Sequence, residues 1–307
     1  MFLKNHVFSL IVGIFLLAGL SSCKSKFEKV RASNNIQMKY QEAVKYYEKG
    51  KYSKALTLFE DLVTRYRGTA EAEDLYYYTA YSSYRLKDYI SARYHFKQFA
   101  DKYPNSQRAE ECRFMSAYCF YLDSPRSNLD QENTRKAIEQ LQLFVNLYPE
   151  SEKAEEAGTL IQDLREKLEK KAFDNAKLYF NMGLPDDYRA AVIALENVLK
   201  VYPDTKHSEE IEYLLVKSQY LFADNSLPRR QEERFNQMLD YYETFSEHYP
   251  ESKYNNELKG LRSSAERKIT TAIKIVEADE KARKKYEEEL GVSNPGTAAE
   301  TAKENEQ

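Results

Sequence analysis

Apolar residues recur along this chain at the spacing of amphipathic helices, with only nine Gly and eight Pro to interrupt them. The clearest pattern is a small residue, an apolar residue four positions later and another three after that, followed by Tyr-Pro-x-Ser or a variant. Residues at these offsets share one helix face, and a small residue there lets a partner helix approach closely. Pro then ends the helix, and Ser or Thr is expected to cap the next one. The pattern therefore predicts a helix, a turn and a second helix.

Five copies of this pattern can be aligned. They begin at Ala55, Ala92, Ala137, Ala191 and Met238 and end at Tyr66, Tyr103, Tyr148, Tyr202 and Tyr249. The pattern resembles the tetratricopeptide repeat, whose period is 34 residues, although the tyrosine spacings here are 37, 45, 54 and 47. We therefore expect an all-α fold, a right-handed superhelical stack of about five tetratricopeptide-type helix hairpins, with insertions or longer helices in the later repeats.

The longer spacings have identifiable sources. Residues 122–133 are polar and turn-rich, which indicates a loop, whereas residues 152–180 contain one Gly and no Pro, which indicates a long mid-chain helix acting as a rigid connector. Residues 258–290 are typical of a charged capping helix. The expected organisation is a signal peptide at 1–22, a lipidated Cys and linker at 23–34, repeats one to three at 35–151, repeats four and five with the capping helix at 152–290, and a disordered tail at 291–307.

The amino terminus has the pattern of an export signal. The apolar run at residues 7–20 follows Lys4 and is too short to span a membrane comfortably, which indicates a signal peptide. The next residues, Ser21-Ser22-Cys23, resemble the end of a bacterial lipobox, so Cys23 is expected to be lipidated; an uncleaved membrane helix is the alternative. The residue directly after Cys23 is Lys24 and not Asp, and residues 24–27 contain no acidic run, which favours the outer membrane and its periplasmic face.

Composition excludes several classes of function. The 46 basic and 49 acidic residues give a net charge of −3, which offers no electrostatic support for nucleic-acid binding. The chain has four His, no Gly-rich phosphate loop and no His-Glu-x-x-His, so we expect no enzyme, metal site or cofactor. Cys112 and Cys119 lie seven apart on one predicted helix, too far for a disulfide, and are expected to be small core residues.

The 26 tyrosines suggest a binding surface. In tetratricopeptide stacks the first helix of each hairpin lines the concave face, and Ala43, Ala80 and Ala117 match its small packing positions. The groove positions three before, one after and four after these alanines are Tyr40, Val44, Tyr47, Tyr77, Tyr81, Tyr84, Phe114, Tyr118 and Tyr121. Such a row would bind a peptide, with its carboxylate near Lys39, Arg85 or Lys87; the alternative is that the tyrosines pack as core.

The lipobox, the five repeats and the long helix together resemble the BamD family, the tetratricopeptide-repeat lipoproteins of the outer-membrane β-barrel assembly machinery. The resemblance covers roughly residues 23–275, with residues 137–149 and 202–206 the most family-like. It implies a component of the Bam complex whose amino-terminal repeats bind unfolded outer-membrane proteins by their carboxy-terminal signal. Its carboxy-terminal repeats would bind the barrel-forming subunit, which carries periplasmic repeat domains. The alternative is a periplasmic repeat scaffold lipoprotein for cell-wall or secretion machinery.

Overall fold

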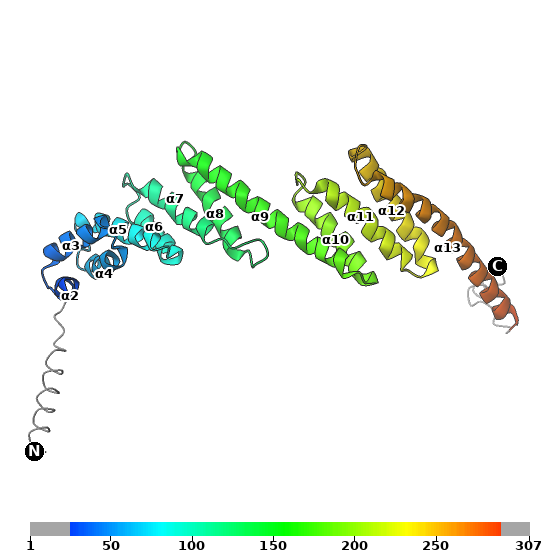
Figure 1. Ribbon diagram of the computed structural model, residues 1–307, viewed down its shortest axis with the longest axis horizontal. Helices are drawn as coiled ribbons and strands as arrows, with labels where there is room; N and C mark the ends of the chain where they lie inside the picture. The colour runs from blue at the N-terminus through cyan, green and yellow to red at the C-terminus, as the bar shows by residue number, and fades with distance from the viewer. Residues whose placement is uncertain (1–24, 290–307) are drawn as a thin grey trace, which may run out of the picture. The chain divides into compact units, whose positions relative to one another are not determined.

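The computed structural model describes residues 25–289, and the regular structure in this range is entirely helical (Figure 1), which confirms the predicted fold class. The predicted signal peptide, Cys23 and the predicted tail at 291–307 lie outside the described residues. The helices are α2 (Lys26–Arg31), α3 (Ile36–Glu48), α4 (Tyr52–Val63), α5 (Glu71–Arg85), α6 (Tyr89–Lys102), α7 (Ala109–Leu122), α8 (Glu132–Leu147), α9 (Lys153–Met182), α10 (Pro185–Val201), α11 (Ser208–Asp224), α12 (Pro228–His248) and α13 (Asn255–Glu289). Within residues 25–289, no helix combines the length and the apolar character needed to cross a membrane.

The chain divides into two compact units between Arg165 and Glu166, inside α9. In the first unit, helices α3 to α8 form three hairpins, each packed against the next. The repeated stripe fills the interfaces: Ala55, Phe59, Leu62, Ala92, Phe96, Phe99, Ala137, Leu141 and Phe144 are all at most 2% exposed. The first part of α9 completes this unit, because Leu160 and Leu164 pack against the third hairpin.

In the second unit, the rest of α9 packs with α10 and α11 through Phe173 and Ala176. Helices α11, α12 and α13 pack together, with Leu258 and Ala265 of α13 in the shared core. The stripe residues Ala191, Leu195, Val198, Met238, Tyr242 and Phe245 are buried here too. The described segments thus confirm the helix pairs that the sequence predicts.

The Ser or Thr that follows each Tyr-Pro pair does not cap the next helix as expected. The N-cap residue of α7 is Arg108, and its side chain makes no capping hydrogen bond. Ser106 lies two residues earlier, where its Oγ accepts a hydrogen bond from the Arg108 amide at 3.1 Å and donates to Glu73 of α5 at 2.5 Å. The same pairing joins Ser151 to Glu110 and Thr205 to Glu169. These hydroxyls therefore link one repeat to the next, because a tight turn separates them from the helix start.

Three further segments match or extend the sequence prediction. The predicted loop lies between α7 and α8, where the buried Gln131 donates from its amide to the carbonyls of Arg126 and Leu129 at 2.8 and 2.9 Å. The long helix predicted at 152–180 is α9. The short helix α2 occupies part of the predicted linker, because Ser25 caps its first turn and Val30 is buried in the core of the first hairpin.

Candidate binding surfaces

We call the nine predicted groove positions on α3, α5 and α7 the tyrosine face. Eight of the nine side chains are partly buried, and Phe114 is 3% exposed. Their rings also pack on the core: Tyr81 meets Phe96 with 4.9 Å between ring centroids, and Tyr47 meets Tyr78 at 5.0 Å. The tyrosine face is therefore an aromatic surface whose inner edges belong to the core and whose outer edges are accessible.

The rings form two rows along the helices. On α5, the ring centroids of Tyr77 and Tyr81 lie 4.7 Å apart, and those of Tyr81 and Tyr84 lie 6.2 Å apart. On α7, Tyr118 stacks on both Phe114 and Tyr121, with 5.8 Å between centroids in each pair. The structure thus brings the predicted positions of α5, and those of α7, together as continuous aromatic contacts, whereas Tyr40 and Tyr47 of α3 contact other rings.

A carboxylate that the sequence did not single out lies in the tyrosine face. Glu111 of α7 accepts hydrogen bonds from the hydroxyls of Tyr77, at 3.2 Å, and Tyr81. Burial and the Glu111 charge raise the pKa of Tyr77 to about 12, and burial raises the pKa of Tyr81 further. The negative charge of Glu111 would repel an incoming carboxylate here, and its oxygens already accept from both hydroxyls. From the sequence alone, Glu111 is an acid in the first turn of a helix, where it favours the helix dipole.

The three predicted cations differ in availability. Lys39 is 2% exposed and pairs with Asp61 of α4, so its ammonium is already used inside the first hairpin. Arg85, at the end of α5, is exposed and lies beside the Tyr47 hydroxyl, where it opposes the rise in the pKa of Tyr47 that burial causes. Lys87 is exposed two residues later. Of the three predicted cations, the two available to a ligand therefore both lie at the carboxy end of α5.

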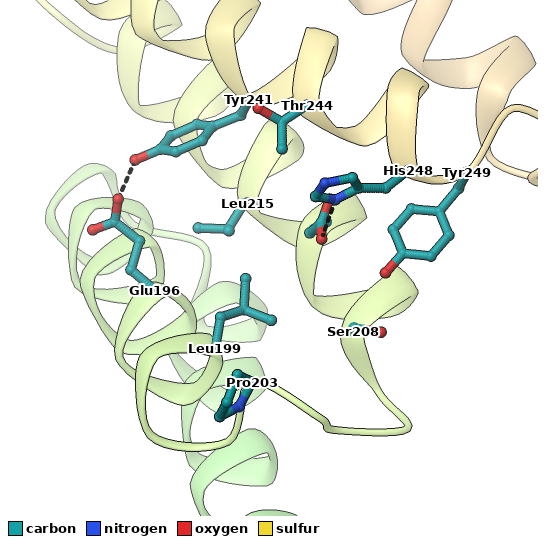
Figure 2. A pocket seen from close by; sticks show the side chains of 10 residues that line it. Glu196, Leu199, Pro203, Ser208, Leu215, Tyr241, Thr244, His248 and Tyr249 are labelled. Atoms are coloured by element: carbon teal, nitrogen blue, oxygen red, sulfur yellow. Dashed lines mark hydrogen bonds and ion pairs between the residues drawn. The ribbon is translucent and has the colours of Figure 1, made fainter.

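The second unit contains a separate cavity of about 580 Å³ between α10, α11 and α12. Figure 2 shows the side chains that line it, which are Glu196, Leu199, Pro203, Ser208, Glu212, Leu215, Tyr241, Thr244, His248 and Tyr249. Tyr241 donates a hydrogen bond to Glu196. Burial raises the pKa of Tyr241, and this hydrogen bond raises it further. His248 Nδ1 lies 3.0 Å from Glu212.

This cavity is acidic, because its ten lining residues include two glutamates and neither Lys nor Arg. The sequence did not predict it, since Pro203 and Tyr249 belong to the repeated turn pattern, which was assigned only a structural role. The pairing of Tyr241 with Glu196 joins residues 45 positions apart, and no local pattern shows it.

The two cysteines are free and buried in α7, as expected for core residues. Burial raises the pKa of the Cys119 thiol to about 12 and that of Cys112 further. Among residues 25–289, no cluster of three or more His, Cys, Asp or Glu has a geometry suited to a metal ion.

Comparison with known proteins gives matches of several kinds. A family model named YfiO and described as "Outer membrane lipoprotein" matches residues 32–185, about half of the chain. The outer membrane protein assembly factor BamD of Caulobacter vibrioides is 22% identical over 223 residues, which cover 72% of each chain. A relative in Aquifex aeolicus, provisionally named an outer membrane protein assembly factor BamD, is 26% identical over 283 residues, covering 92% of this chain and 86% of its own length.

Solved structures give a weaker match. A thermophilic tetratricopeptide-repeat protein of Thermus thermophilus is 17% identical, covering 75% of this chain and 98% of its own, with a TM-score of 0.29. That score is too low to support an argument about the arrangement of the repeats, so the fold is assigned from the helix pairs described above.

Proposed function

This chain belongs to the YfiO family of outer membrane lipoproteins, and from that membership we propose that it acts in outer-membrane protein assembly, the role named for its relatives. It does so by binding proteins and not by catalysis. Cys23 carries the lipid anchor and holds the protein at the periplasmic face of the outer membrane. Lipidation is tested by the intact mass of the protein and of a Cys23→Ser variant. Acyl chains on the first and not on the second support the anchor, and an unmodified Cys23 contradicts it.

The tyrosine face is the proposed site for unfolded outer-membrane proteins, which would bind by an aromatic carboxy-terminal residue. The observation that carries this proposal is the continuous row of accessible ring edges on α5, which ends at the exposed Arg85 and Lys87. An aromatic side chain would lie against these rings, and the terminal carboxylate would pair with Arg85. Because Glu111 repels anions farther along the face, the charges favour one orientation of the peptide.

The test is a fluorescence-anisotropy titration of a labelled ten-residue peptide that ends in Phe with a free carboxylate. Changing Tyr77, Tyr81 and Tyr118 together to Ala should weaken binding by well over tenfold. Changing Arg85 to Gln leaves the ring packing intact and should weaken it about tenfold. Tyr94→Ala is the control, because Tyr94 is 60% exposed on α6, away from the tyrosine face.

Amidating the peptide carboxylate separates the two contributions. The amidated peptide should bind the wild-type protein as weakly as the free acid binds the Arg85→Gln variant. Unchanged affinity in the triple Tyr variant, once its far-ultraviolet circular dichroism is shown to match wild type, would rule out the tyrosine face as the client site.

The second unit is the proposed docking region for the barrel-forming assembly subunit with periplasmic repeat domains. Its acidic cavity supports this proposal, because apolar side chains beside two glutamates suit a basic side chain with an aliphatic stem. A pulldown in mild detergent through a carboxy-terminal tag should recover a large β-barrel protein. A Tyr241→Ala/His248→Ala variant should lose it, whereas recovery of mainly cell-wall synthases or secretion components would favour the alternative scaffold function.

A further inference from the structure

A second cavity, of about 300 Å³, lies at the amino end of the described chain between α2 and the α3–α4 turn. We call it the lysine pocket, because five lysines line it: Lys26, Lys45, Lys49, Lys51 and Lys54. The turn itself explains how these residues come together. Gly50 has a φ of +67°, a conformation that Gly adopts without steric cost, and it reverses the chain between Lys49 and Lys51.

The positive charge of the lysine pocket is only partly neutralised. Glu42 is the single acid in its lining, and it pairs with Lys45 at 3.0 Å and with Lys26 at 3.2 Å. Both pairs hold the pKa of Glu42 below its usual range. Lys49 and Lys51 are exposed, and no acid among residues 25–289 forms an ion pair with either of them. The pocket therefore presents a surplus of ammonium groups to whatever enters it.

The wall of the lysine pocket is aromatic. Phe27 of α2 and Tyr46 of α3 meet edge to face with 5.7 Å between centroids. The Lys54 ammonium lies 5.4 Å from the Phe27 centroid and 5.8 Å from that of Tyr46. A site with cations at its rim and partly exposed aromatic rings beside them is suited to a ligand that is anionic at one end and apolar next to it.

The position of the pocket in the chain indicates which ligand that is. Lys26 comes three residues after Cys23, and three extended residues span at most about 11 Å. If Cys23 carries the anchor, as the proposed function has it, this part of the protein is held within reach of the lipid headgroups. We propose that the lysine pocket binds the phosphate headgroup of an anionic lipid in the membrane that holds the anchor. This inference rests on the proposed lipidation of Cys23 for the source of the ligand.

The experiment is native mass spectrometry of the full protein purified in detergent, with phosphatidylglycerol or phosphatidylethanolamine as the added lipid. Wild type should retain the anionic lipid in preference to the zwitterionic one. Changing Lys49 and Lys51 together to Gln should weaken retention of phosphatidylglycerol about thirtyfold, since each basic residue at an anionic surface contributes roughly fivefold. The matched control is Lys259→Gln/Lys274→Gln, which removes the same charge from exposed positions of α13 and should change nothing.

The outcomes separate the pocket from the anchor. Equal retention of the two lipids overturns the proposal that the lysine pocket binds an anionic headgroup. Undiminished retention of phosphatidylglycerol in the Lys49/Lys51 variant overturns it as well. Complete displacement of the lipid by millimolar inorganic phosphate also overturns it, because the site would then be one for soluble anions. The same spectra give the intact mass, so a protein without acyl chains on Cys23 contradicts the anchor independently of the lipid preference.

Discussion

The ion pair between the buried Lys39 and the partly exposed Asp61 tests how the first hairpin is held together. The Lys39 side chain is 2% exposed and that of Asp61 is 40% exposed, so the ammonium depends on this carboxylate for its charge partner. Asp61→Asn removes that partner and leaves a positive charge inside the hairpin. Lys39→Met removes the charge and keeps an apolar side chain of similar length.

The two substitutions should differ in cost. Removing one member of a fully buried pair costs about 3–5 kcal/mol, whereas an exposed pair contributes about 1 kcal/mol or less. Because Asp61 is partly exposed, we expect Asp61→Asn to cost about 2 kcal/mol. Lys39→Met should lie within about 1 kcal/mol of wild type, because it removes the buried charge and leaves the Asp61 carboxylate, whose side chain is 40% exposed, in contact with water.

Hydrogen–deuterium exchange in α3 and α4 is the suitable assay, because repeat proteins open locally and α3 and α4 form the first hairpin. The opening equilibrium in these helices should increase about thirtyfold in Asp61→Asn and by a few-fold at most in Lys39→Met. The hydrogen bond from Lys39 lowers the pKa of Asp61. The stability that the pair provides is therefore fully present above pH about 4, the unfolded value, and is lost as the pH falls through the folded value. Equal exchange in the two variants at pH 7 would refute this reasoning.

Three other predictions follow from contacts described above. Ser151→Ala removes the hydroxyl bond to Glu110 and should cost about 1–2 kcal/mol in urea denaturation, whereas the control Ser263→Ala at an exposed position of α13 should cost nothing measurable. Absorbance at 295 nm should show Tyr77 ionising near pH 12, and Tyr77→Phe should remove that transition. Because the pKa of Tyr77 is raised in the folded protein, the contribution of Tyr77 to stability is complete below pH about 10 and is lost as the pH rises toward 12. Cys112 and Cys119 should react with a thiol reagent at pH 8 only after denaturation, and rapid reaction of the native protein would contradict their burial.

The helices were predictable because burial leaves a regular record in the sequence. The stripe from Ala92 to Phe99 has only apolar residues on one face of α6, and the structure buries that face completely. The limits of α9 were predictable too, since no Pro interrupts it. The short helix α2 was missed because six residues are too few to show periodicity.

The partners of polar groups were not predictable in the same way. Lys39 was expected to face a ligand, but Asp61, which binds it, lies 22 residues away on the next helix. Glu111 was missed because nothing near it in the sequence shows that two tyrosines 30 and 34 residues earlier donate to it. The position of each residue on its helix follows from periodicity, whereas the pairing between helices depends on the crossing geometry, which periodicity does not encode.

The packing of each hairpin against its sequence neighbour also bears on how the protein folds. Contacts within each unit join helices that follow one another closely in the chain, and the Ser106–Glu73 and Ser151–Glu110 bonds span only 33 and 41 residues. Closing such short segments costs little entropy, so folding should be fast and should need no contact between distant parts of the chain. During synthesis or export, the amino end of the chain comes first, so each hairpin can fold before the next one is available. Each folded repeat then provides the packing surface for the repeat that follows.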